Sequence, residues 1–182
     1  MKNIKFTILF IWLSIYSVSA QINDVITFSI NDIEIDTIEG YLKLSMPECS
    51  YTDVIGYPEL PRIEVRYVIP TDKIVSNVIV SDSVVQILQG DYLIFPHQPS
   101  TRMGDTLALF VQPDSSVYGS GFPYPRKMVE IANQYYEFGY HIALLYVYPL
   151  IYYPQQHTLR FNSSMFLFSF FNIIWIFTIF HE

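Results

Sequence analysis

The spacing of apolar runs constrains the fold of this chain more than any other feature of its sequence. From residue 21 to residue 161, short runs of alternating or continuous apolar residues are separated by turn-forming residues at intervals of roughly eight to twelve residues. No stretch in this range shows the i, i+3, i+4, i+7 apolar spacing that an amphipathic helix would require. The sequence therefore predicts an all-β domain, built as an antiparallel β-sandwich or a jelly roll.

The most sharply bounded strand follows the turn that runs from Gly56 to Pro61 with the sequence Gly-Tyr-Pro-Glu-Leu-Pro. Prolines fix the backbone angles ahead of this strand, and Pro70, which lacks a backbone N–H, ends it. Apolar and charged residues alternate between these limits. The alternation predicts one core-facing row, formed by Ile63, Val65 and Tyr67.

Two later segments give further predictions. Residues 139–148 are apolar on both faces, which is typical of a strand in the middle of a sandwich. We expect its Ile142, Leu144 and Tyr146 to face the core. Gly90 and Asp91 separate the apolar runs 84–88 and 92–95, and this pattern predicts a hairpin between two strands.

The two ends of the chain are distinct from the domain between them. Residues 1–20 have two lysines, an apolar run and a small-residue ending, as in a secretory signal peptide that is cleaved after Ala20. We therefore expect a secreted protein or one of the bacterial cell envelope. Residues 162–182 form an apolar tail, for which three explanations stay open: a frameshift or truncation product, a last buried strand, or a membrane contact.

The net charge limits the kinds of partner that the chain can bind, and the cysteine content limits how the domain can be stabilised. Without residues 1–20, the chain has eight basic and seventeen acidic residues, a formal charge of −9. An acidic chain with scattered Lys and Arg makes nucleic acid an improbable partner. Cys49 is the only cysteine, so the domain has no internal disulfide and depends on a packed core. We expect a free, partly buried thiol, because the neighbouring Glu48 disfavours a reactive thiolate.

The residues that commonly carry catalysis or hold cofactors form no recognisable site. The four histidines lie far apart in sequence and lack metal-ligand spacing. The sequence has no glycine-rich phosphate loop, no G-x-S-x-G elbow, and no carboxylate pair that can be assigned as acid and base. We therefore predict no catalytic residue, no metal and no cofactor, and a binding or folding module instead of an enzyme.

The order of several weak motifs resembles a known family over roughly residues 54–161. A G-x-P-x-L-P turn is followed by a strand, by Ile69-Pro70 and by further strands, and a Tyr-x-Pro motif then lies close to Thr158-Leu159-Arg160. This order is similar to that of the prodomain of gingipain-type cysteine peptidases. The resemblance implies a jelly-roll sandwich that folds with a cognate peptidase domain and masks its active site until cleavage. The catalytic Cys and His of that family belong to a separate domain, and we expect no such domain in residues 1–182.

The same resemblance supplies one candidate site residue. In Arg-specific members of the family, an Arg on a loop after an Ile-Ala-Pro strand end occupies the specificity pocket of the peptidase. The corresponding strand end here is Leu93-Ile94-Phe95-Pro96, and the loop after it carries Arg102, so the resemblance implies that Arg102 is an inhibitory residue. Phe95 departs from the small residue of the family pattern. The alternative is a secreted or surface β-sandwich that binds a protein or a glycan and is unrelated to proteolysis.

Overall fold

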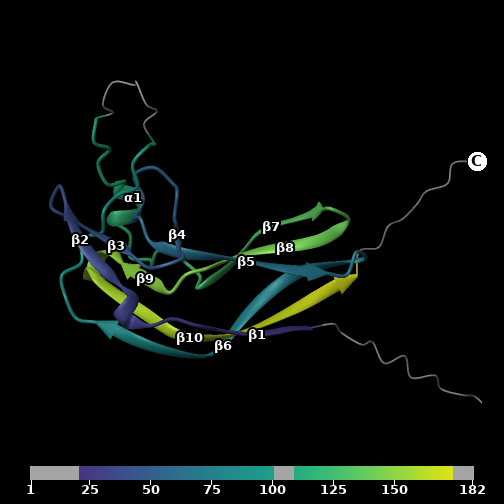
Figure 1. The fold of residues 1–182 in the computed structure, drawn as a ribbon. Helices are drawn as coiled ribbons and strands as arrows, with labels where there is room; N and C mark the ends of the chain where they lie inside the picture. Colours follow the sequence, from purple (N-terminus) through teal and green to yellow (C-terminus); the bar gives the residue numbers. More distant parts are fainter. Residues whose placement is uncertain (1–20, 101–108, 174–182) are drawn as a thin grey trace, which may run out of the picture.

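The computed structural model describes residues 21–100 and 109–173. It is an antiparallel β-sandwich with two four-stranded sheets, a separate hairpin and very little helix (Figure 1). The strands are β1 (Gln21–Thr27), β2 (Glu34–Ile38), β3 (Tyr41–Ser45), β4 (Ser50–Tyr51), β5 (Pro61–Ile69), β6 (Lys73–Leu88), β7 (Val129–Glu137), β8 (Tyr140–Val147), β9 (Leu150–Tyr153) and β10 (Thr158–Ile173). The helical turns are η1 (Ile30–Asp32), α1 (Ser115–Tyr118) and η2 (Pro154–Gln156). The all-β, antiparallel prediction is confirmed.

One sheet is built around the long strand β10, and the other around β8. β10 lies between β1 and β6, and its first residues also pair with β9. The second sheet has the order β4-β5-β8-β7, so β8 lies in the middle of its sheet, as predicted. The hairpin β2-β3 turns at Glu39 and Gly40, which both have positive φ angles, 53° and 84°. Glycine tolerates this conformation without the steric cost that a side chain brings.

Three apolar clusters of described residues hold these elements together, and one of them consists of the buried residues Ile69, Val75 and Ala143. The cluster between the sheets contains the buried residues Val129, Leu145 and Val147, packed against side chains of β1, β5 and β6. The last cluster lies at the end of the sandwich where β3, β9 and the start of β10 meet, and Tyr152, Ile94 and Phe161 are at most 1% exposed there. This last cluster positions the loop region described below.

The prediction for β8 was wrong about which face is buried. His141, Ala143, Leu145 and Val147 face the core, while Ile142, Leu144 and Tyr146 lie on the outer face and are partly exposed. The register with β5 pairs Ile63 with Val147 and Tyr67 with Ala143, so the predicted row of β5 does face inward, partly buried. Both faces of β8 are apolar, so alternation alone could not select between them. The buried His141 ring also stacks on Tyr136, with ring centres 4.4 Å apart.

The predicted hairpin at Gly90 and Asp91 is also absent. β6 runs as one strand from Lys73 to Leu88, and it pairs with β10 instead of with residues 92–95. After Gly90 the chain crosses to β3, where Leu42 and Ile94 form a parallel bridge. The backbone N–H of Leu42 donates to Leu93 O at 2.8 Å, and that of Phe95 donates to Leu42 O at 2.9 Å. This path buries Ile94 completely in the core, which a surface hairpin would not do.

The structure describes part of the C-terminal tail and none of the predicted signal peptide. β10 runs across residue 161 to Ile173, pairing with β1 and β6, so the boundary predicted at 161 falls inside a strand. The origin of the tail stays a prediction, and residues 174–182 and the predicted signal peptide lie outside the described residues. None of the described helices is long and apolar enough to cross a membrane.

Candidate functional site

The turn from Gly56 to Pro61 packs against the strand end that precedes the loop of interest. Gly56 N–H donates to His97 O at 2.9 Å, His97 N–H donates to Tyr57 O at 2.8 Å, and Glu59 N–H donates to Phe95 O at 2.8 Å. Gly56 has a φ of 80°, which a residue with a side chain rarely adopts. These bonds make residues 56–61 a fixed support for residues 95–98.

Thr52 holds the turn of residues 56–61 in place through two hydrogen bonds. Its hydroxyl group donates to Pro58 O at 2.7 Å and accepts from Leu60 N–H at 3.0 Å. Thr52 is 3% exposed, so both bonds lie within the protein interior. Prolines at 58 and 61 cannot donate hydrogen bonds, and Thr52 supplies the polar partners that keep this proline-rich turn in place.

A buried carboxylate lies at the centre of this region. Glu59 is 6% exposed, and its two carboxylate oxygens contact different partners: Lys43 Nζ at 2.9 Å and His97 Nδ1 at 2.7 Å. The Lys43 ammonium group also lies 5.8 Å from the Tyr51 ring centre and 5.5 Å from that of Phe95. A buried carboxylate needs partners of this kind to offset its desolvation. Glu59 therefore ties β3 to the residue that begins the loop.

The described flanks of the loop are joined to each other by Gln98. Its side-chain amide donates to Pro96 O at 2.8 Å and to Val111 O at 3.0 Å, and its side-chain oxygen accepts from Val111 N–H at 2.8 Å. Phe110 stacks on Tyr41 and contacts Phe95, with ring centres 5.8 and 5.9 Å apart. We call residues 56–61, 95–98 and 109–114 the loop anchor. It closes the base of the segment between residues 98 and 109.

Arg102, the candidate inhibitory residue, belongs to residues 101–108 and lies outside the described residues. Its role stays a prediction. The loop anchor itself was not predicted, because its contacts join residues far apart in sequence. Lys43, Glu59 and His97 carry no local pattern that indicates a cluster. The Gly-Tyr-Pro-Glu-Leu-Pro motif was the one available signal, and it predicts a turn before a strand and supports the family resemblance, but it does not predict the contacts with residues 95–98.

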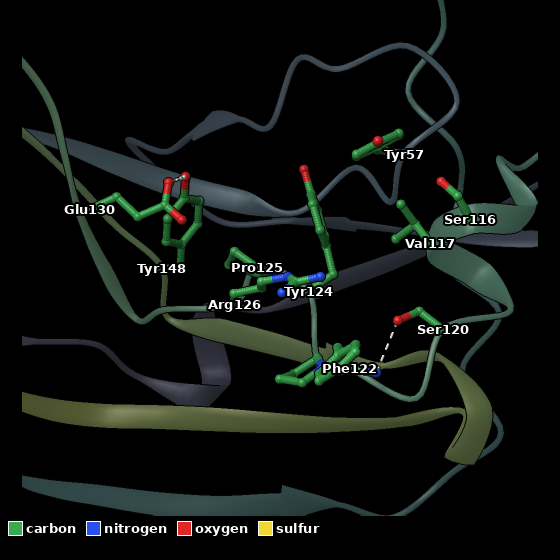
Figure 2. A pocket seen from close by; sticks show the side chains of 11 residues that line it. Tyr57, Ser116, Val117, Ser120, Phe122, Tyr124, Pro125, Arg126, Glu130 and Tyr148 are labelled. Carbon is green, nitrogen blue, oxygen red and sulfur yellow. Dashed lines mark hydrogen bonds between the residues drawn. The ribbon is translucent and has the colours of Figure 1, made fainter.

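A pocket of about 480 Å³ adjoins the loop anchor (Figure 2). Tyr57 and Tyr124 line it with an edge-to-face ring contact at 5.7 Å, and the Tyr148 hydroxyl group donates to Glu130 at 3.3 Å. Burial, followed by the nearby Glu130 charge, raises the pKa of Tyr148 above its usual range. The described lining has no histidine or cysteine. Its aromatic rings and hydroxyl groups are suited to contacting a peptide or a polar ligand.

Cys49 is a free, partly buried thiol, as predicted. It packs at the edge of the core that contains Met46 and Leu60. Burial, and secondly the charge of Glu48, raises the pKa of the thiol, which disfavours the nucleophilic thiolate. Within residues 21–100 and 109–173, no group of three or more His, Cys, Asp or Glu side chains could hold a metal ion.

Comparison with known proteins identifies the fold. No protein-family model and no curated protein matches the sequence. Solved structures do match, and two of them cover 87% of the chain. One, on the zymogenic latency of gingipain K from Porphyromonas gingivalis, has a TM-score of 0.68 and 21% identity, with 90% of its chain covered. The other, a complex of the Porphyromonas gingivalis RgpB pro- and mature domains, has a TM-score of 0.71 and 15% identity, with 84% covered. The chain therefore has a gingipain-type prodomain fold.

Proposed function

We propose that this chain is a prodomain-like module that folds with a gingipain-type cysteine peptidase and keeps it latent. The similarity to the gingipain K and RgpB structures over 87% of the chain is the observation that carries the proposal. One of those structures concerns zymogenic latency and the other a complex of pro- and mature domains. The module itself is proposed to be non-catalytic, in line with the unreactive environment of Cys49.

We further propose that the module is exported, with residues 1–20 acting as a signal peptide cleaved after Ala20. Prodomains that restrain a secreted peptidase must fold in the same compartment as that peptidase. A domain without a disulfide that is stable after export needs a packed core, and the apolar clusters between the sheets and around Tyr152 provide one.

Arg102 is the proposed inhibitory residue. The loop anchor supports this role, because Gln98 and the Glu59 contacts fix both flanks of the segment that carries Arg102. A loop with fixed ends loses less conformational entropy on binding than a loop with free ends. A guanidinium group can then form a bidentate pair with an acid at the bottom of a specificity pocket.

Inhibition of an Arg-specific gingipain-type peptidase by residues 21–182 tests this proposal. We expect wild type to inhibit and Arg102→Ala to be weaker, by roughly 30-fold to several thousand-fold in the inhibition constant, which corresponds to about 2 to 5 kcal/mol. Arg66→Ala, an exposed arginine on the outer face of β5, is the matched control and should inhibit like wild type.

The possible outcomes distinguish a role of Arg102 in inhibition from a role of the whole module. Equal inhibition by wild type and Arg102→Ala would remove Arg102 from the mechanism and leave the broad sandwich surface as the inhibitory element. No inhibition by wild type of either Arg-specific or Lys-specific gingipain-type peptidases would contradict the latency proposal. The alternative of a secreted binding module unrelated to proteolysis would then be preferred.

A further inference from the structure

A groove runs between one edge of β6 and the segment 123–131, which leads into and begins β7. Two adjoining hollows of about 340 and 440 Å³ form it, and both are lined by Val78, Arg126, Lys127 and Val129. We call this feature the sheet-edge groove. No residue of the loop anchor lines it, although Arg126 also lines the pocket that adjoins the loop anchor.

The β6 edge in this groove has no strand partner among the described residues. β6 pairs with β10 along one edge, and none of the described strands forms a ladder with the other. At Val75, on the same strand, the side-chain amide of Gln134 takes the place of a neighbouring strand. Its oxygen accepts from Val75 N–H at 2.8 Å, and its nitrogen donates to Val75 O at 3.0 Å. This pair of bonds is what a peptide group of an added strand would form.

The groove also concentrates positive charge in an acidic protein. Arg126, Lys127 and Arg160 line it, although the chain after residue 20 has only eight basic residues. No carboxylate of the described residues lies within 4.0 Å of these three cations. The guanidinium groups rest on aromatic rings instead, that of Arg126 4.7 Å from Phe122 and that of Arg160 4.7 Å from Tyr153.

The groove floor is apolar, with Val78, Val80 and Met128 contributing to it. An extended strand presents its side chains alternately to opposite sides. A segment with acidic and apolar residues in alternation can therefore place its apolar side chains on this floor and direct its carboxylates to the cations. Glu130, the acid at one end of the groove, accepts a hydrogen bond from Tyr148 and leaves the cations available to another acid.

We propose that the sheet-edge groove binds an extended acidic segment of a partner protein, which adds to the free edge of β6 as a strand. The free edge supplies backbone hydrogen bonds, and the cations select for carboxylates. The inference does not rest on the prodomain-like role, because no residue of the loop anchor lines the groove. A chain that inhibits no peptidase would still bind the segment.

Binding of three labelled nine-residue peptides to residues 21–182, followed by fluorescence anisotropy, tests the inference. The first peptide alternates valine and aspartate, the second has asparagine in place of every aspartate, and the third is the acidic peptide with proline in place of its central valine. We expect the acidic peptide to bind, the asparagine peptide to bind at least threefold more weakly, and the proline peptide to lose most of its affinity. Binding of the acidic peptide should weaken as salt is added.

A charge variant tests the assigned residues. The double variant Arg126→Gln, Lys127→Gln should weaken binding of the acidic peptide about two- to thirty-fold, since each of the two exposed ion pairs that it removes contributes about 0.2 to 1 kcal/mol. Arg66→Gln is the control and should bind like wild type; thermal unfolding checks that every variant is folded. The inference would be overturned by equal binding of the acidic and asparagine peptides or by an unchanged affinity of the double variant. Full binding of the proline peptide, or no binding of the acidic peptide, would also overturn it.

Discussion

Glu59 joins β3, the Gly56–Pro61 turn and the start of the loop through one carboxylate group. The sequence predicts the turn from its prolines, but it does not predict the contact with Lys43 and His97, which lie 16 and 38 residues away. Contacts of this kind depend on which strands become neighbours, and no local pattern encodes that. The residue-level prediction that succeeded, a free and partly buried Cys49, depended only on adjacent residues and composition.

Replacing Glu59 with glutamine should lower the free energy of unfolding by about 1 to 3 kcal/mol. Removing one partner of a fully buried ion pair costs about 3 to 5 kcal/mol, and Lys43 is one-third exposed, so water partly compensates here. Equilibrium unfolding in urea measures the change. Glu64→Gln, an exposed acid on β5, should stay within about 0.5 kcal/mol of wild type. Equal stability of the two variants would show that the Glu59 contacts contribute nothing.

The sequence predicts best a strand whose ends are marked by prolines in its own sequence. Prolines delimit β5, so the bounds of this strand follow from local chemistry. The inward face of β8 and the course of residues 92–95 were predicted wrongly, because each depends on the partner strand. An apolar run fits a hairpin and a buried crossover equally well until the core that it fills is known.

Gln134 gives a test of how the two sheets are joined. Its amide forms two hydrogen bonds with the backbone of Val75, and Val75 is 2% exposed. Gln134→Leu should therefore leave a buried N–H and C=O without partners and destabilise the fold by about 1 to 3 kcal/mol. Faster hydrogen exchange at the Val75 amide should accompany the loss. Gln86→Leu, an exposed site on β6, is the control, and a Gln134→Leu protein as stable as this control would contradict the assigned role.

Buried tyrosines make the stability of the whole sandwich sensitive to alkali. Burial raises the pKa of Tyr67, Tyr118 and Tyr148 above the usual range, and it raises the pKa of Tyr152 to about 12. Unfolded tyrosines ionise near pH 10, so above that pH the unfolded chain holds fewer protons than the folded protein. Stability from these groups is fully present below about pH 10 and is lost as the pH rises through their folded pKa values.

Urea unfolding at several pH values between 8 and 12 checks this dependence. Tyr152→Phe removes one buried hydroxyl group, so the decline in stability above pH 10 should become shallower by at most about 1.4 kcal/mol per pH unit. Tyr140→Phe, whose side chain is 61% exposed, should decline like wild type. Stability that is constant up to pH 12, or identical declines for Tyr152→Phe and wild type, would show that these hydroxyl groups ionise in the folded protein.

Formation of a complex with a peptidase tests the central claim most directly. Residues 21–182 should be mixed with a gingipain-type peptidase domain whose catalytic cysteine is replaced by alanine, and the mass of the eluted species measured by light scattering after gel filtration. The account predicts a one-to-one complex, and no complex with papain, a cysteine peptidase outside this family. Separate elution of the module from every gingipain-type domain, or equal binding to papain, would contradict it.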